Sequence, residues 1–231
     1  RDLVHALAPF VGGFKIGLEF IYSNIVTLLL APENVAIDFL RQLRALAKEI
    51  ERSKVLWDLK LADIPNTIKG ASLAISRTGA MFNIHASCGR KSVQAAVQNK
   101  GECLVFGVTV LTSIDEEECS SIFGGNPGEK VIQFAKMLEE EGADGIICSP
   151  KELKALKGVP LIKATPGVRP TWAQKGDQKR VSTPYEAVRD GADFLIIGRP
   201  IRQPAAGSPA EAARKVASEI EAALSGRQEK G

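Results

Sequence analysis

The sequence predicts an α/β fold, a (β/α)8 barrel of the TIM type, as a single domain over residues 1–231. Short apolar runs alternate with longer amphipathic segments along the whole chain, with no linker and no low-complexity tract between them. No glycine-rich dinucleotide-binding fingerprint follows any of these runs, which weighs against an open, doubly wound sheet.

Seven apolar runs predict buried parallel strands, because most of them end at a polar residue or a glycine. They cover residues 14–16, 55–57, 80–84, 103–110, 145–148, 160–164 and 194–197. A closed barrel of this type needs eight strands, and this chain starts in a helical segment over residues 2–9. We therefore expect a first strand upstream of Arg1.

The segments between these runs carry apolar residues at helical spacing, as Val35, Ile37, Leu40 and Leu43 do in the first of them. Glycine closes several of the segments, as it commonly closes helices. The predicted helices cover residues 35–51, 66–77, 91–98, 128–141, 150–156, 184–190 and 209–224, and the acidic run 115–118 predicts another helix start.

The composition excludes several classes of protein. Thirty basic against 27 acidic residues leave a net charge of +3, too small for a broad nucleic-acid-binding face. No stretch approaches the ~20 apolar residues of a membrane span. The four cysteines form no CxxC pair and there are two histidines, so we expect no metal site. Sparse cysteine favours a reducing compartment, so we expect a cytoplasmic protein.

Charged residues gather at the end of the second predicted strand, where Asp58 and Lys60 alternate and Asp63 follows. The two-residue period of a strand points Asp58 and Lys60 to the same side, into the mouth of the barrel. Lys15 ends the preceding strand, so neighbouring strand ends place it beside Asp58. We expect all four side chains to converge there with alternating sign.

Such an array suits catalysis because the carboxyl ends of the strands form the active face of these barrels. Flanking carboxylates favour the ammonium form of Lys60, which is poorly suited to Schiff-base chemistry. An ammonium ion can stabilise a developing carbanion and then donate a proton to it. The alternative is an ion-pair network that only closes the barrel.

The last strand and the loop before it predict a phosphate site. Gly198 lets a backbone N–H approach an anion, and Arg199 adds a forked cationic partner. The loop over residues 165–180 is long, polar and glycine-bearing, as expected for a closing lid, although a plain surface loop would look similar.

Four segments together resemble the signatures of the orotidine 5′-phosphate decarboxylase family. They are Asp58-x-Lys60-x-x-Asp63-Ile64-Pro65-Asn66-Thr67, Thr165-Pro166-Gly167-Val168-Arg169, Gly176-Asp177-Gln178-Lys179-Arg180 and Gly198-Arg199-Pro200-Ile201. The likeness runs from about residue 14 to residue 201 and keeps the order of the family's motifs. It implies a homodimeric TIM barrel that converts orotidine 5′-phosphate to UMP and CO2, the last step of de novo pyrimidine nucleotide synthesis. It implies no cofactor, no metal and no covalent intermediate.

The resemblance also implies roles for individual residues. Lys60 would protonate C6 as CO2 leaves, Asp58 would lie near the substrate carboxylate, and Lys15 would contact Asp58 and a ribose hydroxyl. The segment that holds Asp63, Ile64, Asn66 and Thr67 would belong to the site, with Asp63, Ile64 and Thr67 reaching the neighbouring subunit's site. The pyrimidine, lid and phosphate contacts would come from Thr112, Arg169, Gln178, Gly198 and Arg199.

One feature departs from the family pattern, and two other functions stay open. The family places a ribose-binding aspartate at the end of its first strand, and Asp2 lies instead in a helical segment, so that role is not assigned to it. One alternative is a metal-dependent sugar-phosphate decarboxylase or aldolase of the same superfamily. The other is a non-catalytic UMP-binding barrel. Trp172, in the lid segment, fits either an exposed residue or a clamp.

Overall fold

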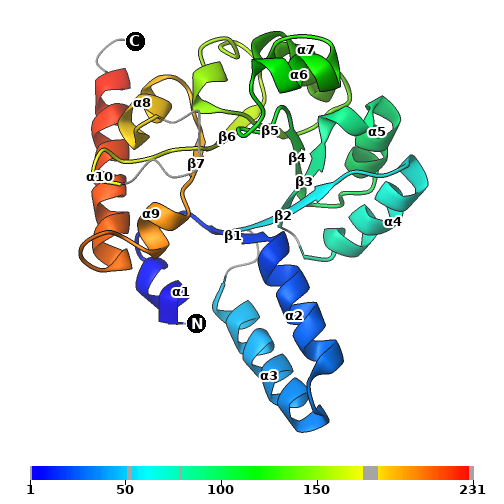
Figure 1. The fold of residues 1–231 in the computed structure, drawn as a ribbon, viewed down its shortest axis with the longest axis vertical. Helices are drawn as coiled ribbons and strands as arrows, with labels where there is room; N and C mark the ends of the chain where they lie inside the picture. Colours follow the sequence, from blue (N-terminus) through cyan, green and yellow to red (C-terminus); the bar gives the residue numbers. More distant parts are fainter. Residues whose placement is uncertain (1, 51–53, 79, 174–181, 229–231) are drawn as a thin grey trace.

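The computed structural model of the protein describes residues 2–50, 54–78, 80–173 and 182–228. Its strands form one parallel sheet in the order of the sequence, curved around a central axis with helices outside it (Figure 1). The seven strands are β1 (Phe14–Gly17), β2 (Val55–Leu61), β3 (Met81–His85), β4 (Leu104–Val108), β5 (Gly145–Ile147), β6 (Ile162–Pro166) and β7 (Phe194–Ile196).

These strands confirm the predicted barrel architecture and lie within a few residues of the predicted runs. In the described part of the chain, β1 and β7 are the two edges of the sheet, so the barrel is nearly closed. An eighth strand of a closed barrel would lie between these edges. A strand upstream of Arg1 stays a prediction.

The helices alternate with the strands as the amphipathic pattern predicted. They are α1 (Asp2–Leu7), α2 (Leu18–Leu30), α3 (Glu33–Glu49), α4 (Pro65–Ser76), α5 (Arg90–Gln98), α6 (Glu116–Phe123), α7 (Pro127–Glu140), α8 (Pro184–Arg189), α9 (Arg199–Arg202) and α10 (Pro209–Gln228), with 3-10 turns η2 (Ala86–Cys88) and η3 (Pro150–Glu152). The described helices include none that is long and apolar enough to cross a membrane.

The barrel core consists of apolar side chains on both faces of the central strands. Phe82 and Ile84 of β3 and Ile146 of β5 are fully buried. Because helices cover the outer face, these strands lie between two apolar layers and read as almost unbroken apolar runs in the sequence. The rigid centre of the sheet therefore fixes the positions of the residues at its carboxyl edge.

Several described helical segments differ from the prediction, and the short elements η2 and α9 were not predicted. Helix α2 was not predicted: its sequence is mostly apolar, and the recurrence of Glu19, Ser23 and Thr27 at helical spacing was overlooked. With α3 it forms a hairpin that projects from the barrel (Figure 1), and neither helix contains a buried residue. The helix predicted over residues 150–156 is only the 3-10 turn η3, whose N-terminus is capped by the capping box between Ser149 and Glu152. The apolar spacing that predicted a helix here comes from Leu153 and Leu156, which are buried outside η3.

Candidate active site

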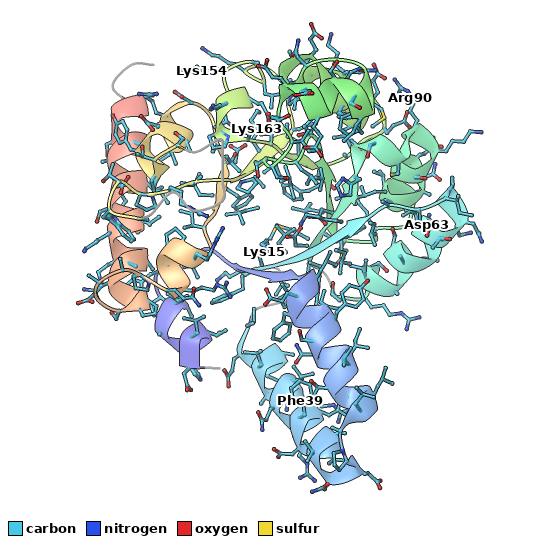
Figure 2. All side chains as sticks on the ribbon, viewed as in Figure 1. Lys15, Phe39, Asp63, Arg90, Lys154 and Lys163 are labelled. Atoms are coloured by element: carbon cyan, nitrogen blue, oxygen red, sulfur yellow. The ribbon has the colours of Figure 1, made fainter. Side chains whose placement is uncertain are left out.

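Three charged side chains meet at the carboxyl ends of β1 and β2. Lys15 Nζ lies 2.6 Å from Asp58 Oδ2, and Lys60 Nζ lies 2.6 Å from Asp58 Oδ1. The strands bring them together, since β1 and β2 pair in parallel with Gly17 opposite Asp58. Lys15 lies on β1, which forms one wall of the barrel (Figure 2). The predicted convergence of Lys15, Asp58 and Lys60 is therefore confirmed.

Asp58 is the buried member of this cluster, with 7% of its surface exposed. Burial alone would raise its pKa, but hydrogen bonds from Lys15, Lys60 and Asn83 outweigh burial and lower the pKa from 3.8 to about 2. The carboxylate is therefore ionised at every physiological pH, and its charge is shared between two ammonium groups.

The backbone of Lys60 is strained. Its φ is 49°, and among the described residues it is the one non-glycine residue with positive φ. This conformation costs a non-glycine residue about 1–3 kcal/mol and persists only where the surrounding structure imposes it. The strain lies at the residue whose ammonium group faces the cavity described below, as is common at functional sites.

Asn83 of β3 was missed by sequence reasoning. It is fully buried, donates from Nδ2 to Asp58 Oδ1 at 2.6 Å and accepts from the Lys60 backbone N–H at 2.6 Å. A polar amide within the apolar run over residues 80–84 was the available signal, because buried polar groups need partners.

Asp63 does not join the cluster in this chain, so the predicted convergence of four charges is wrong for a single chain. Its side chain is exposed and accepts a hydrogen bond from the Ile64 backbone N–H, while Ser92 donates to its backbone carbonyl. The reason is topological: β2 ends at Leu61, and Asp63 lies in the turn that leads outward from β2 to α4 (Figure 2). Ile64 is exposed in the same turn, Asn66 and Thr67 are exposed at the start of α4, and none of the three lines the cavity.

A cavity of about 330 Å³ opens beside the charged cluster at the carboxyl ends of the strands. Seven of the predicted site residues line it: Lys15, Asp58, Lys60, Thr112, Arg169, Gly198 and Arg199. Its apolar walls come from Val108, Val110, Leu111, Ile147 and Ile196. This volume lies in the range of small-molecule sites, and apolar walls with a few converging polar groups are typical of them.

Three arginines, one after β6 and two in α9, also line the cavity. Arg169 and Arg199 were predicted there, and Arg202, one helical turn beyond Arg199, was missed. A second hollow of about 250 Å³ adjoins Arg169 and Arg199. Two lysines from β1 and β2 and three arginines from the segments after β6 and β7 line the same cavity, and they match a ligand with two negatively charged groups.

The lid prediction is tested only at its base. Arg169 N–H donates to the Ser182 carbonyl at 2.8 Å, so the two ends of the loop lie together. Gln178 and the rest of its motif lie outside the described residues. Trp172, left open above, is half-buried against the cluster of Leu7 and Ile201, with Lys215 Nζ 5.7 Å from its ring centroid.

Other titratable groups near the cavity offer little chemistry. Burial, and next the charge of Glu152, raise the pKa of Cys148 to about 12, so this cavity-lining thiol stays protonated. Within the described ranges, no group of three or more histidine, cysteine, aspartate or glutamate residues is placed to hold a metal ion.

A family model and individual relatives of known name all point to the same family. The family model described as "Orotidine 5'-phosphate decarboxylase / HUMPS family" matches residues 1–216. The orotidine 5'-phosphate decarboxylase of Moorella thermoacetica is 39% identical to this chain, over 96% of this chain and 86% of that protein. The protein of the same name from Anaeromyxobacter sp. strain K is 43% identical, over 94% and 91%.

A solved structure agrees with this family. The crystal structure of orotidine 5'-phosphate decarboxylase from Lactobacillus acidophilus superposes with a TM-score of 0.68 at 26% identity, over 95% of this chain and 94% of that one. The family match covers the strands that carry Lys15, Asp58 and Lys60 and extends through Arg199 and Arg202 of α9. The chain belongs to the orotidine 5'-phosphate decarboxylase / HUMPS family.

Proposed function

We propose that this protein decarboxylates orotidine 5'-phosphate to UMP and CO2, the last step of de novo pyrimidine nucleotide synthesis. The observation that carries the proposal is one cavity lined both by the Lys15–Asp58–Lys60 cluster and by the arginines that follow β6 and β7. The substrate has a carboxylate on its base and a phosphate on its ribose, which match these two groups of cationic side chains. The names of the relatives support the same reaction.

In this reaction the C6–carboxylate bond breaks and CO2 leaves, so the bonding electron pair stays on C6. The ammonium group of Lys60 stabilises that negative charge and then donates its proton to C6, which yields UMP. Asp58 stays ionised and holds both lysine ammonium groups in place. No electrons are gained or lost overall, and the proton is replaced from solvent.

The other predicted residues bind the substrate. Thr112 would hydrogen-bond the pyrimidine, Lys15 a ribose hydroxyl, and Gln178 would bridge base and phosphate from the lid. Arg169, Gly198 and Arg199 would hold the phosphate together with Arg202, whose position supports the same role. Binding energy gained at the phosphate, remote from C6, then helps to close the lid over the reacting base.

The active form is a cytoplasmic homodimer in which Asp63, Ile64 and Thr67 complete the partner's site. The exposure of this turn supports the proposal, since Ile64, a large apolar residue, is 66% exposed. An apolar side chain at the rim beside charged and polar neighbours is suited to burial against a second copy of the chain.

The proposal is tested by following the loss of orotidine 5'-phosphate with purified protein, with and without a chelator. We expect turnover that is insensitive to the chelator. Lys60→Ala should lower kcat at least about a thousandfold, because it removes both charge stabilisation and the proton donor. Lys91→Ala, an exposed lysine on α5, is the matched control and should keep full activity.

Two results would favour the alternatives. Activity abolished by the chelator and restored by a divalent cation would favour a metal-dependent sugar-phosphate enzyme. Tight UMP binding without turnover would favour a non-catalytic UMP-binding barrel.

A further inference from the structure

Asn83 is bonded to two members of the catalytic cluster by one side chain. Its Nδ2 donates to Asp58 Oδ1 at 2.6 Å, and its Oδ1 accepts from the Lys60 backbone N–H at 2.6 Å. It is fully buried within β3 and does not line the cavity. Both hydrogen-bonding groups of the amide are therefore directed at the residues proposed for catalysis rather than at the ligand.

The register between β2 and β3 explains why Lys60 uses a side-chain acceptor. Trp57 pairs with Phe82, and the next pair joins Leu61 to Ile84. Between these two pairs β2 contains two more residues than β3, so the register shifts there. Asp58, Leu59 and Lys60 form this irregular segment, and its strain appears at Lys60, where φ is 49°. The amide of Asn83 lies opposite the segment and accepts the N–H that the regular ladder leaves out.

We propose that Asn83 is a positioning residue for the decarboxylation, holding the strained Lys60 backbone and the Asp58 carboxylate in one fixed relation. This inference rests on the proposed function. The direction of the Lys60 side chain follows from its backbone conformation, and the conformation is retained by a hydrogen bond to Asn83. The same amide donates to the Asp58 carboxylate that accepts a hydrogen bond from the Lys60 ammonium group. Asn83 therefore positions both the backbone of Lys60 and the partner of its ammonium group.

The neighbouring charges determine how a substitution at this position behaves. Lys15 of β1 and Lys60 of β2 contact Asp58, and His85 of β3 interacts electrostatically with both Asp58 and Lys60. A carboxyl group in place of the Asn83 amide would lie within hydrogen-bond distance of Asp58. Ionised, it would repel Asp58, whereas protonated it would donate to Asp58 as the amide does.

Three variants test the inference by steady-state kinetics on orotidine 5'-phosphate and by UMP binding in calorimetry. Asn83→Ala removes both hydrogen bonds and should lower kcat by up to about a hundredfold, while the UMP dissociation constant stays near the wild-type value. Asn83→Asp keeps the acceptor for Lys60 N–H. Its kcat relative to wild type should therefore rise as the pH falls from about 8 to about 5, because protonation restores the donor.

The control for a merely structural role is Ile84→Ala, a cavity-forming change at the next residue of β3, which is fully buried. Ile84→Ala should lower the melting temperature at least as much as Asn83→Ala does. Its kcat, calculated per protein molecule able to bind UMP, should equal that of wild type. A crystal structure of Asn83→Ala should show Lys60 at negative φ.

Two outcomes would overturn the inference. One is an unchanged kcat in Asn83→Ala, and the other is a lower activity of Asn83→Ala that is fully explained by a smaller fraction of protein able to bind UMP. An Asn83→Asp variant with a pH profile parallel to wild type would also contradict it. If the wild-type protein itself does not consume orotidine 5'-phosphate, the proposed function fails instead, whatever these variants do.

Discussion

The Asp58 carboxylate accepts hydrogen bonds from side chains on three neighbouring strands, Lys15 on β1, Lys60 on β2 and Asn83 on β3. Burying a charge is costly unless partners neutralise it, and here two ammonium groups and an amide do so. The same hydrogen bonds hold the two lysines in place. They therefore both offset the cost of burying the Asp58 carboxylate and orient Lys60, the proposed proton donor.

The lowered pKa of Asp58 predicts a specific acid sensitivity. Because its pKa falls from 3.8 to about 2 on folding, the ionised carboxylate contributes stability that is present above pH 3.8 and lost as the pH falls toward 2. The full contribution is roughly 2 kcal/mol, about half of it lost by pH 3.

Urea unfolding of wild type and Asp58→Asn at pH 6 and pH 3 measures this contribution. The difference between the two pH values should be about 1 kcal/mol smaller in the variant. Glu33→Gln, which removes an exposed carboxylate from α3, should follow wild type. Equal acid sensitivity in Asp58→Asn and wild type would contradict the assignment.

Because Arg199 lines the cavity, we expect its substitution to weaken the binding of ligands that carry a phosphate. Arg199→Ala should weaken UMP binding by about 1.5–3 kcal/mol, because it removes a hydrogen-bonding partner with a full charge. Uridine, which has no phosphate, should bind both proteins equally. Titration calorimetry with the two ligands tests this, with Arg90→Ala as control, an arginine paired with Glu140 and Glu141 at the surface. An equal loss for both ligands would place Arg199 away from the phosphate.

At the scale of the elements, close approaches between strands set the position of the site. Gly145 begins β5 where the ring of Phe106 on β4 and the backbone of β6 leave no room for a side chain. A Cβ atom there would lie 2.7 Å from the Ile162 carbonyl oxygen, and backbone cannot move aside cheaply. The spacing of β4, β5 and β6 depends on this glycine.

Gly145→Ala should therefore destabilise the protein by about 1–3 kcal/mol. Gly128→Ala, in the exposed first turn of α7, is the matched change: its nearest contact would be 3.4 Å away, so it should be neutral or stabilising by up to about 1 kcal/mol. Chemical denaturation of both variants measures the difference. A Gly145→Ala protein as stable as wild type would contradict the packing described for β5.

On the scale of the whole molecule, the exposed turn at Asp63 and Ile64 divides the proposed site between two chains. Lys60 and Asp63 are close in sequence, yet they face different directions, one into the cavity and one toward the rim. If sites are shared, a chain that lacks Lys60 and a chain that lacks Asp63 can together form one intact site.

Mixing inactive Lys60→Ala and Asp63→Ala proteins after reversible unfolding should therefore restore activity. Random pairing makes half of the dimers hybrids with one intact site of two, so about a quarter of wild-type activity is expected. Light scattering should show a dimer in each sample. Mixtures no more active than the separate proteins would mean that Asp63 acts within its own chain or not at all.

Sequence reasoning found most of the site because strand periodicity and topology are local or regular properties. The two-residue period predicted that Asp58 and Lys60 share a face, and they do meet although the strand is irregular between them. Lys15 meets them because sequential strands of a barrel are neighbours. It failed for Asp63, whose direction depends on where β2 ends. It also missed Asn83 and Arg202, which read as a strand interior and a surface arginine until their neighbours are known.

The sequence by itself determined the alternation of seven strands with helices, the sign and order of the charges at the carboxyl ends, and the family to which the chain belongs. These follow from hydrophobic period and motif spacing, which are properties of consecutive residues. Only the tertiary structure decided the strained backbone of Lys60, the two hydrogen bonds of Asn83 and the outward direction of Asp63. Each arises from the register between β2 and β3 or from the turn into α4, where residues distant in sequence compete for the same hydrogen bonds and space.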